Sequence, residues 1–270
     1  GLGPAHGAGP LRCCSTTCID MDCTFSAILQ KLCNALRVMS VKYQNYEQPL
    51  NERIRMCLRV ETLMKRYAYF EVLKGDWSAY SALLTILELT ALLERGDLKQ
   101  ELMKELERQH TALKALSKHE SVDHSKLDLI LSKQKHALDC LHKLDGKLGE
   151  HLKRNDFLLG IKQRTSIPGG SCDFDLPQLR YWLNQSHEQR NADLRNWVAP
   201  YLELDQVIEL ILKTLRDSAN PRSAVAENGF YQKPLDPKQS TQLMRISVNM
   251  DSGMYPEISA GKHRYSVRFM

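Results

Sequence analysis

The spacing of the apolar residues changes once along this chain, and that change limits the folds it can adopt. Up to Pro221 the apolar residues recur every three or four positions, which is the period of amphipathic helices. After Pro221 they alternate with polar residues, as in strands that bury one face. Helical segments followed by a run of strands predict an α+β fold, a mainly helical bundle domain followed by a smaller antiparallel β domain.

The same change in period suggests three parts. Residues 1–38 are expected to be a disordered leader, residues 39–219 the helical domain, and residues 220–270 the β domain. A short strand at the start of the helical domain, around Tyr43 and Tyr46, can join the β domain.

The leader has its own composition. It is rich in Gly, Pro, Ser, Thr and Cys and holds five of the eight cysteines, ahead of a short amphipathic stretch from Phe25 to Leu36. The cysteine cluster lacks the paired C-x2-C knuckles of zinc folds. The other cysteines, Cys57, Cys140 and Cys172, are scattered, which is typical of a reducing, cytoplasmic protein. We interpret the leader as upstream sequence or a cloning remnant and exclude it from functional reasoning.

Apolar stripes predict the helices and their ends. Asn51 is the expected cap of a helix, and Asp97 with Gln100 forms a capping box for a later one. Asp175 is the expected cap of a helix with Pro177 in its first turn, and Trp182 and Trp197 are expected core anchors. The expected core positions are Ile54, Cys57, Val60, Met64 and Tyr67; Leu83–Leu93; Leu98, Leu102, Leu106, Leu113 and Leu116; Leu127, Leu131, Leu138 and Leu141; and Leu204, Ile208, Ile211, Leu212 and Leu215.

Charge and hydropathy exclude some classes of protein. The net charge is +5, with a pI near 8.7. This mild excess suits an anionic protein partner at least as well as nucleic acid, so a nucleic-acid-binding or other basic adaptor stays open as an alternative. The longest apolar run is far shorter than the ~20 residues that span a bilayer, so we expect no direct membrane insertion.

Possible catalytic and metal sites are weak. His136 and Cys140 are spaced to share a metal ion on one helix face, but no further ligands stand at useful spacing. Cys172 follows a Gly-Gly turn without the G-x-S-x-G or P-loop pattern of a reactive or phosphate-binding loop. We therefore expect no enzyme activity, no catalytic residues, no metal and no cofactor.

The last predicted strand carries the more informative charges. Arg264 and Arg268 alternate with Tyr265, Val267 and Phe269, which puts the two arginines on one face, about 13 Å apart at roughly 3.3 Å per residue. Two guanidinium groups at this spacing can grip the carboxylates of an extended acidic peptide. The simpler interpretation is the ordinary polar face of a half-exposed sheet.

Sequence blocks spread over residues 40–270 resemble those of one family, the bacterial Z-ring-associated proteins D, or ZapD family. The blocks, in chain order, are Tyr46-Glu47-x-Pro49-Leu50-Asn51-Glu52-Arg53, Leu58-Arg59-Val60-Glu61, Leu92-Leu93-Glu94-Arg95-Gly96, Arg164-x-Ser166-Ile167-Pro168-Gly169-Gly170-x-Cys172-x-Phe174-Asp175-Leu176-Pro177, Asn228-Gly229-Phe230-Tyr231, Tyr255-Pro256-x-Ile258-Ser259 and Arg264-Tyr265-x-Val267-Arg268-Phe269-Met270.

This resemblance implies a non-enzymatic, cytoplasmic division factor at the mid-cell ring. Members form homodimers, bind the C-terminal tail of the tubulin-like protein FtsZ, bundle its protofilaments, promote Z-ring assembly and reduce FtsZ GTPase activity. The resemblance assigns the tail pocket to Arg95, Arg264 and Arg268, and a second, bundling-associated basic group to Arg59 and Arg180. It also implies a further β segment after Met270, so we expect the β domain to be truncated.

Overall fold

A computed structural model of the chain describes residues 42–94, 97–118, 123–144, 149–236, 241–261 and 263–270. The leader and Arg95 lie outside these ranges, so the expectations attached to them are not addressed by the fold. Among the described residues, no helix combines the length and the hydropathy needed to cross a membrane.

The described residues contain seven α-helices, five strands and two short 3₁₀ helices. The α-helices are α2 (Glu52–Glu71), α3 (Asp76–Leu93), α4 (Leu98–Leu116), α5 (His124–Lys143), α6 (Asp156–Arg164), α7 (Pro177–Leu183) and α8 (His187–Asp217). The strands are β1 (Tyr43–Pro49), β2 (Phe230–Pro234), β3 (Leu243–Asn249), β4 (Pro256–Ala260) and β5 (Arg264–Phe269), and the 3₁₀ helices span Glu150–Arg154 and Met250–Ser252. This order confirms the predicted α+β class.

The strands form two antiparallel sheets. One consists of β1 and β3, with Tyr46 opposite Ile246, so the strand before the first described helix pairs with a strand after the last one. The other has the order β2-β5-β4, with β5 in the centre. Periodicity did not predict β4, because this strand is only five residues long and begins with Pro256.

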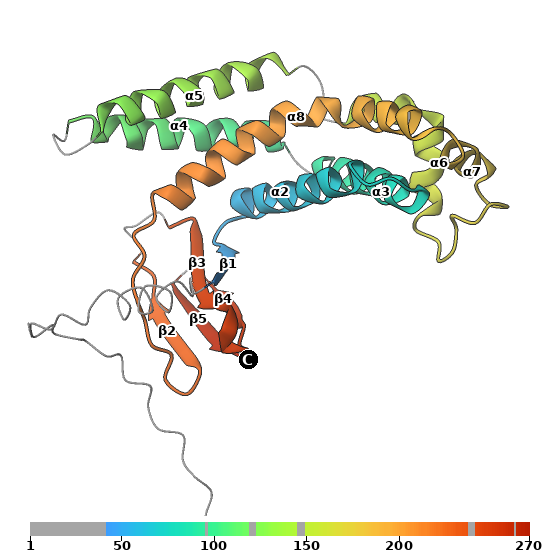
Figure 1. Cartoon of the computed structure of the whole chain (residues 1–270). Coiled ribbons are helices and arrows are strands. Elements are labelled where there is room, and N and C mark those ends of the chain that lie inside the picture. Colours follow the sequence, from blue (N-terminus) through green and yellow to red (C-terminus); the bar gives the residue numbers. More distant parts are fainter. Residues whose placement is uncertain (1–41, 95–96, 119–122, 145–148, 237–240, 262) are drawn as a thin grey trace, which may run out of the picture.

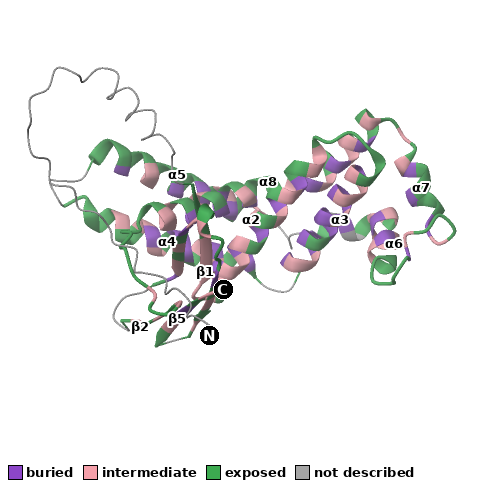
Figure 2. Ribbon diagram, turned by 60° about the horizontal axis from the view of Figure 1, so that its bottom comes forward, coloured by how far each residue is buried: buried purple, intermediate pink, exposed green. Residues whose placement is uncertain are grey.

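The helices pack lengthwise, with the sheets near one end. Figure 1 shows α2, α3 and α8 lying along one another, α4 and α5 beside the C-terminal half of α8, and α6 and α7 at the end far from the strands. The buried positions face neighbouring helices and the outer faces are exposed (Figure 2).

The first helix is the one that the sequence predicts best. Asn51 Oδ1 accepts a hydrogen bond from the backbone N–H of Ile54 at 2.9 Å, which confirms the cap. All five apolar positions predicted for its core face are buried. Burying a large aliphatic side chain contributes roughly 1.5–3 kcal/mol, so this stripe fixes which face of α2 points inward.

Two expectations about α4 and α7 are wrong. Leu116 is 43% exposed and Leu113 is only half-buried, because α8 diverges from the far end of α4 and leaves only α5 beside it (Figure 1). Asp175 does not cap α7; the N-cap is Leu176, and Asp175 lies 3.5 Å from Arg164 in an ion pair. Pro177 does occupy the first turn.

Other expectations are confirmed. Asp97 accepts a hydrogen bond from the Gln100 N–H at 3.2 Å and caps α4. Trp182 is buried and stacks near Trp197 and Phe157, with ring centroids 5.6–5.8 Å apart. These rings join α6, α7 and α8, which fixes the end of the helical part remote from the sheets.

Candidate functional site

The exposed face of β5 is the first part of the candidate site. Arg264 and Arg268 are both exposed, whereas Val267, on the opposite face of the strand, is buried. Arg268 stands opposite Phe230 on β2 and Glu257 on β4. The structure therefore brings the two predicted arginines onto one face, as the alternation requires.

The backbone holds these two arginines at a fixed spacing. Because β5 is the central strand, it is hydrogen-bonded along both sides, to β2 and to β4. The turn before β2 has Asn228 and Gly229 at φ 50° and 75°, and the N–H of Phe269 donates to the Gly229 carbonyl at 2.8 Å. A central strand cannot slip without breaking two ladders, so the spacing is pre-organised.

The charges on this face are available to a ligand. Within the described residues, neither Arg264 nor Arg268 forms an ion pair, although Glu257 is the cross-strand neighbour of Arg268. Phe230, 44% exposed, adds an apolar side chain beside Arg268. Such a face can bind carboxylates through paired N–H donors and contact an apolar side chain next to them.

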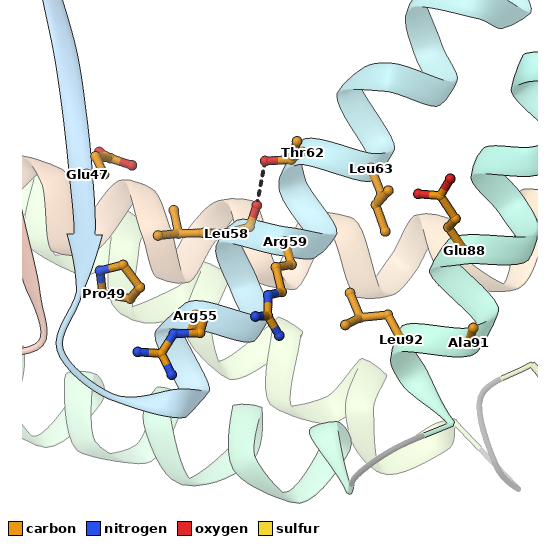
Figure 3. Close-up of a pocket in the computed structure, with 10 residues that line it drawn as sticks. All are labelled: Glu47, Pro49, Arg55, Leu58, Arg59, Thr62, Leu63, Glu88, Ala91 and Leu92. Carbon is orange, nitrogen blue, oxygen red and sulfur yellow. Dashed lines mark hydrogen bonds between the residues drawn. The ribbon is translucent and has the colours of Figure 1, made fainter. Parts of the chain in front are cut away.

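A groove on the helical part contains Arg59, one of the two residues of the second predicted group. It has a volume of about 600 Å³ and lies between α2, the C-terminal part of α3 and the end of β1 (Figure 3). Its lining consists of Glu47, Pro49, Arg55, Leu58, Arg59, Thr62, Leu63, Glu88, Ala91 and Leu92. Arg59 is exposed at this groove, and the helical spacing of the core positions did not predict the apolar residues around it. One sequence pattern could have indicated the groove: the apolar stripe on α2 is wider than its core face requires, because Leu58 and Leu63 flank the core positions.

Arg180 is not part of this groove. It lies on α7, at the end of the helical part far from the strands, and its guanidinium is 3.8 Å from the carboxylate of Asp173. The structure therefore does not bring together Arg59 and Arg180, the two arginines that the resemblance assigns to bundling.

A buried carboxylate joins the helical part to the strands. Glu105 on α4 is fully buried and accepts hydrogen bonds from Arg53 at 2.9 Å, Arg108 at 2.7 Å and Gln242 at 3.1 Å. Burial by itself would raise the pKa of Glu105, but the hydrogen bonds from Arg108 and Gln109 and the nearby arginine charges outweigh it and lower the pKa. Gln242, just before β3, is thereby tied to the helical core.

A second polar cluster lies at the same junction. Arg216, near the end of α8, donates to Glu47 on β1 and to Glu61 on α2, each at 2.7 Å. Arg245 on β3 also donates to Glu47, at 3.0 Å. Burial would raise the pKa of Glu47, but Arg216 and Arg245 outweigh it and lower the pKa; the hydrogen bond from Arg216 likewise lowers the pKa of Glu61. Both clusters fix the β1–β3 sheet against the helices.

The structure does not strengthen either of the weak candidates for a metal or catalytic site. His136 Nε2 and Cys140 Sγ are 3.6 Å apart on α5, and the described residues contain no group of three or more His, Cys, Asp or Glu side chains placed to hold a metal ion. Cys172 is exposed in a turn, where its backbone N–H donates to the Gly169 carbonyl.

Comparisons with a family model and with individual relatives point to the same family. The family model described as "ZapD: Cell division protein" matches residues 58–268. The chain is 38% identical over 224 residues to "Cell division protein ZapD" of Dechloromonas aromatica, covering 83% of this chain and 88% of the relative. It is 37% identical over 225 residues to the protein of that name from Nitrosomonas eutropha, covering 83% and 89%. The chain therefore belongs to the ZapD family of cell division proteins.

Proposed function

We propose that this protein binds the C-terminal tail of FtsZ and crosslinks FtsZ filaments, without catalysing a reaction. The observation that carries the proposal is the outer face of β5, where Arg264 and Arg268 stand on one side of a central strand without described acidic partners. In a member of a cell division family, such a face suits the acidic tail of a division polymer.

Crosslinking follows if two chains associate. A twofold homodimer presents the β5 face twice, so that each copy can hold a tail from a different filament. Many tails line one filament, and weak single contacts then add up to tight overall binding. Bundling of this kind would promote Z-ring assembly at mid-cell in the cytoplasm and reduce FtsZ GTPase activity. In this proposal Arg95 completes the tail pocket, while Arg59 and Arg180 contribute to bundling.

Cosedimentation with FtsZ filaments tests the proposal. Wild-type protein is expected to pellet with filaments, whereas Arg264→Glu and Arg268→Glu are expected to reduce pelleting about tenfold or more, because each change replaces an attraction by a repulsion. Arg95→Glu is expected to act in the same direction. Lys135→Glu, an exposed change on α5, is the matched charge control.

Two further measurements separate tail binding from the alternative of a nucleic-acid-binding or other basic adaptor. Pelleting is expected to fall as salt rises, because screening acts over about 8 Å at physiological ionic strength. FtsZ lacking its tail is expected not to pellet the protein. Undiminished pelleting of both arginine variants would show that the β5 face is not the tail site. A gel shift with duplex DNA would favour the basic adaptor instead.

A further inference from the structure

We propose that Glu257 on β4 limits how tightly the β5 face binds an acidic segment, because it competes with the carboxylates of that segment for Arg268. This inference rests on the proposed function and deepens it by assigning a specificity-determining residue to the same face. The competing carboxylate belongs to the fold, so it is in place before any ligand binds.

Glu257 lies beside Arg268 on one face of the sheet. In the antiparallel pairing of β4 with β5, the Cα atoms of these two residues stand opposite each other. Directly opposite residues of antiparallel strands point to the same face, with Cβ atoms about 4.5–5.5 Å apart. Both side chains are exposed, whereas the preceding residues Pro256 and Val267 are buried on the other face. At this spacing the Glu257 carboxylate can reach the Arg268 guanidinium by a change of rotamer.

Neither charge is committed to another partner. Over the residues that the structure describes, Glu257 and Arg268 form no ion pair, either with each other or elsewhere. Exposed opposite charges at such a distance exchange between pairing and solvation, since an exposed ion pair is only weakly stabilising. An incoming carboxylate therefore meets a cation that is partly compensated, and it is also repelled by Glu257 itself.

Arg264 has no comparable competitor. Its cross-strand neighbour on β2 is Pro234, and on the β4 side its carbonyl accepts a hydrogen bond from the Gly261 N–H at 2.9 Å. Neither of these two positions carries an acidic side chain. A carboxylate can therefore bind at Arg264 without displacing anything, whereas at Arg268 it has to compete with Glu257.

This inequality of the two arginines has a consequence for the ligand. A segment with a single carboxylate gains the open contact at Arg264, and only a segment with a second, well-placed carboxylate can also displace Glu257 from Arg268. The competition keeps each single contact weak. Weak contacts suit a crosslinker, because many of them add up along a filament while each remains exchangeable.

Anisotropy of a synthetic, fluorescently labelled FtsZ tail peptide, titrated with the full chain at about 0.1 M salt, tests this inference. Glu257→Gln removes the charge and keeps the shape, and it is expected to tighten binding about three- to fivefold. Glu257→Lys should tighten binding about tenfold, because a repulsion is replaced by an attraction. Both variants are expected to keep the unfolding temperature of the wild type, since Glu257 is exposed.

The matched controls change the same residue type elsewhere. Glu203 is exposed on α8, roughly 20 Å along that helix from Arg216, which contacts β1. Glu203→Gln and Glu203→Lys are expected to bind within about 1.5-fold of wild type, because screening acts over about 10 Å at this salt concentration. A gain from the controls as large as that from the Glu257 variants would reflect net charge alone and would overturn the inference.

Paired variants show whether Glu257 acts through Arg268. In protein that carries Arg264→Gln, Glu257→Gln should still tighten binding about threefold, because the competition at Arg268 persists. In protein that carries Arg268→Gln, the same change should alter binding less than about 1.5-fold, because no cation is left to compete for. Equal gains in the two backgrounds would contradict the competition.

Two other results would also overturn the inference while the proposed function survives. If Glu257→Gln binds the peptide as wild type does, Glu257 does not compete for Arg268. If Glu257→Gln binds it more weakly, Glu257 contacts the peptide directly instead. The proposed function itself fails if neither wild-type protein nor any Glu257 variant binds the tail peptide, and the inference then fails with it.

Discussion

At the scale of single residues, Asp205 is in an unfavourable position for a charged group. It lies half-buried on α8, and burial, with the neighbouring charges of Glu209 and Glu61, raises its pKa to about 6. An unfolded aspartate has a pKa near 3.9. The folded state therefore holds an extra proton between these values and loses stability as the pH rises through about 6.

Replacing Asp205 by asparagine should remove this penalty. We expect Asp205→Asn to stabilise the fold by about 1 kcal/mol at pH 7.5, a value reduced for partial exposure, and to have little effect near pH 4. Urea denaturation at the two pH values measures the difference. Asp128→Asn, an exposed change on α5, is the control, and an equal effect of Asp205→Asn at both pH values would contradict the explanation.

At the scale of elements, the connection into the 3₁₀ helix before α6 depends on a glycine. Gly149 has φ +84°, and a Cβ atom added there would lie 2.9 Å from both Thr90 on α3 and the Tyr201 hydroxyl on α8. Those two side chains are hydrogen-bonded to each other at 2.9 Å in the core. The connection therefore passes very close to the contact between α3 and α8.

A pair of glycine substitutions separates backbone strain from this close approach. Gly253 also has a positive φ, +66°, but an added Cβ would meet nothing within 4 Å. We expect Gly253→Ala to cost about 1 kcal/mol of unfolding free energy, the strain of the left-handed region alone. Gly149→Ala should cost about 2–3 kcal/mol, because overpacking is added. Equal losses of unfolding free energy for the two variants in chemical denaturation would show that the side chains beside Gly149 move aside to accept the added methyl group.

The sequence predicted most elements and missed what depends on neighbours. The α2 stripe and the Asn51 cap follow from local spacing, and both are confirmed. Leu116 at the end of α4 has the same periodicity but remains exposed, and no local pattern predicts that. The buried polar Glu105 was missed for the same reason, since its partners come from distant segments.

The sequence also predicted only the part of the candidate site that depends on local spacing. The common face of Arg264 and Arg268 followed from alternation within one strand, and the structure bears it out. The groove around Arg59 is built from three elements whose packing a periodicity does not specify. That Arg59 and Arg180 lie apart also depends on packing, because α7 lies at the end of the helical part far from the strands, whereas α2 begins next to them. The roles of all these arginines remain predictions.

At the scale of the whole molecule, charged groups link the β1–β3 sheet to the helices. Arg216, Glu47 and Glu61 are each less than a quarter exposed, with side-chain exposures of 20%, 15% and 14%. Without Arg216, Glu47 would keep only Arg245 and Glu61 only Lys65, and each carboxylate would lose hydrogen bonds in a place largely closed to water, which is more damaging than losing an exposed pair.

Arg216→Met tests the strength of this junction. At pH 7 we expect it to lower the free energy of unfolding by about 2 kcal/mol, because charge-assisted hydrogen bonds are lost while each carboxylate keeps one cation. The pKa values of Glu47 and Glu61 are lowered in the fold, so their contribution is present above the unfolded value near 4.3 and is lost as the pH falls through the folded values. The effect of the variant should therefore shrink towards pH 3.

Unfolding in urea across this pH range measures the effect of Arg216→Met. Lys213→Met removes an exposed ion pair to Asp217 on the same helix and should change little at any pH. If the loss of unfolding free energy caused by Arg216→Met stays constant down to pH 3, the loss comes from packing rather than from charge.

The pairing of β1 with β3 has a consequence for the order of folding. β1 ends at Pro49 and its partner begins at Leu243, so the first described strand leaves the ribosome roughly 200 residues before the strand that completes it. At translation rates of roughly 5–20 residues per second, the nascent β1 waits about ten seconds or longer with an unpaired edge. The intervening helices are made before β3, so their packing can bring the two ends together before this small sheet closes.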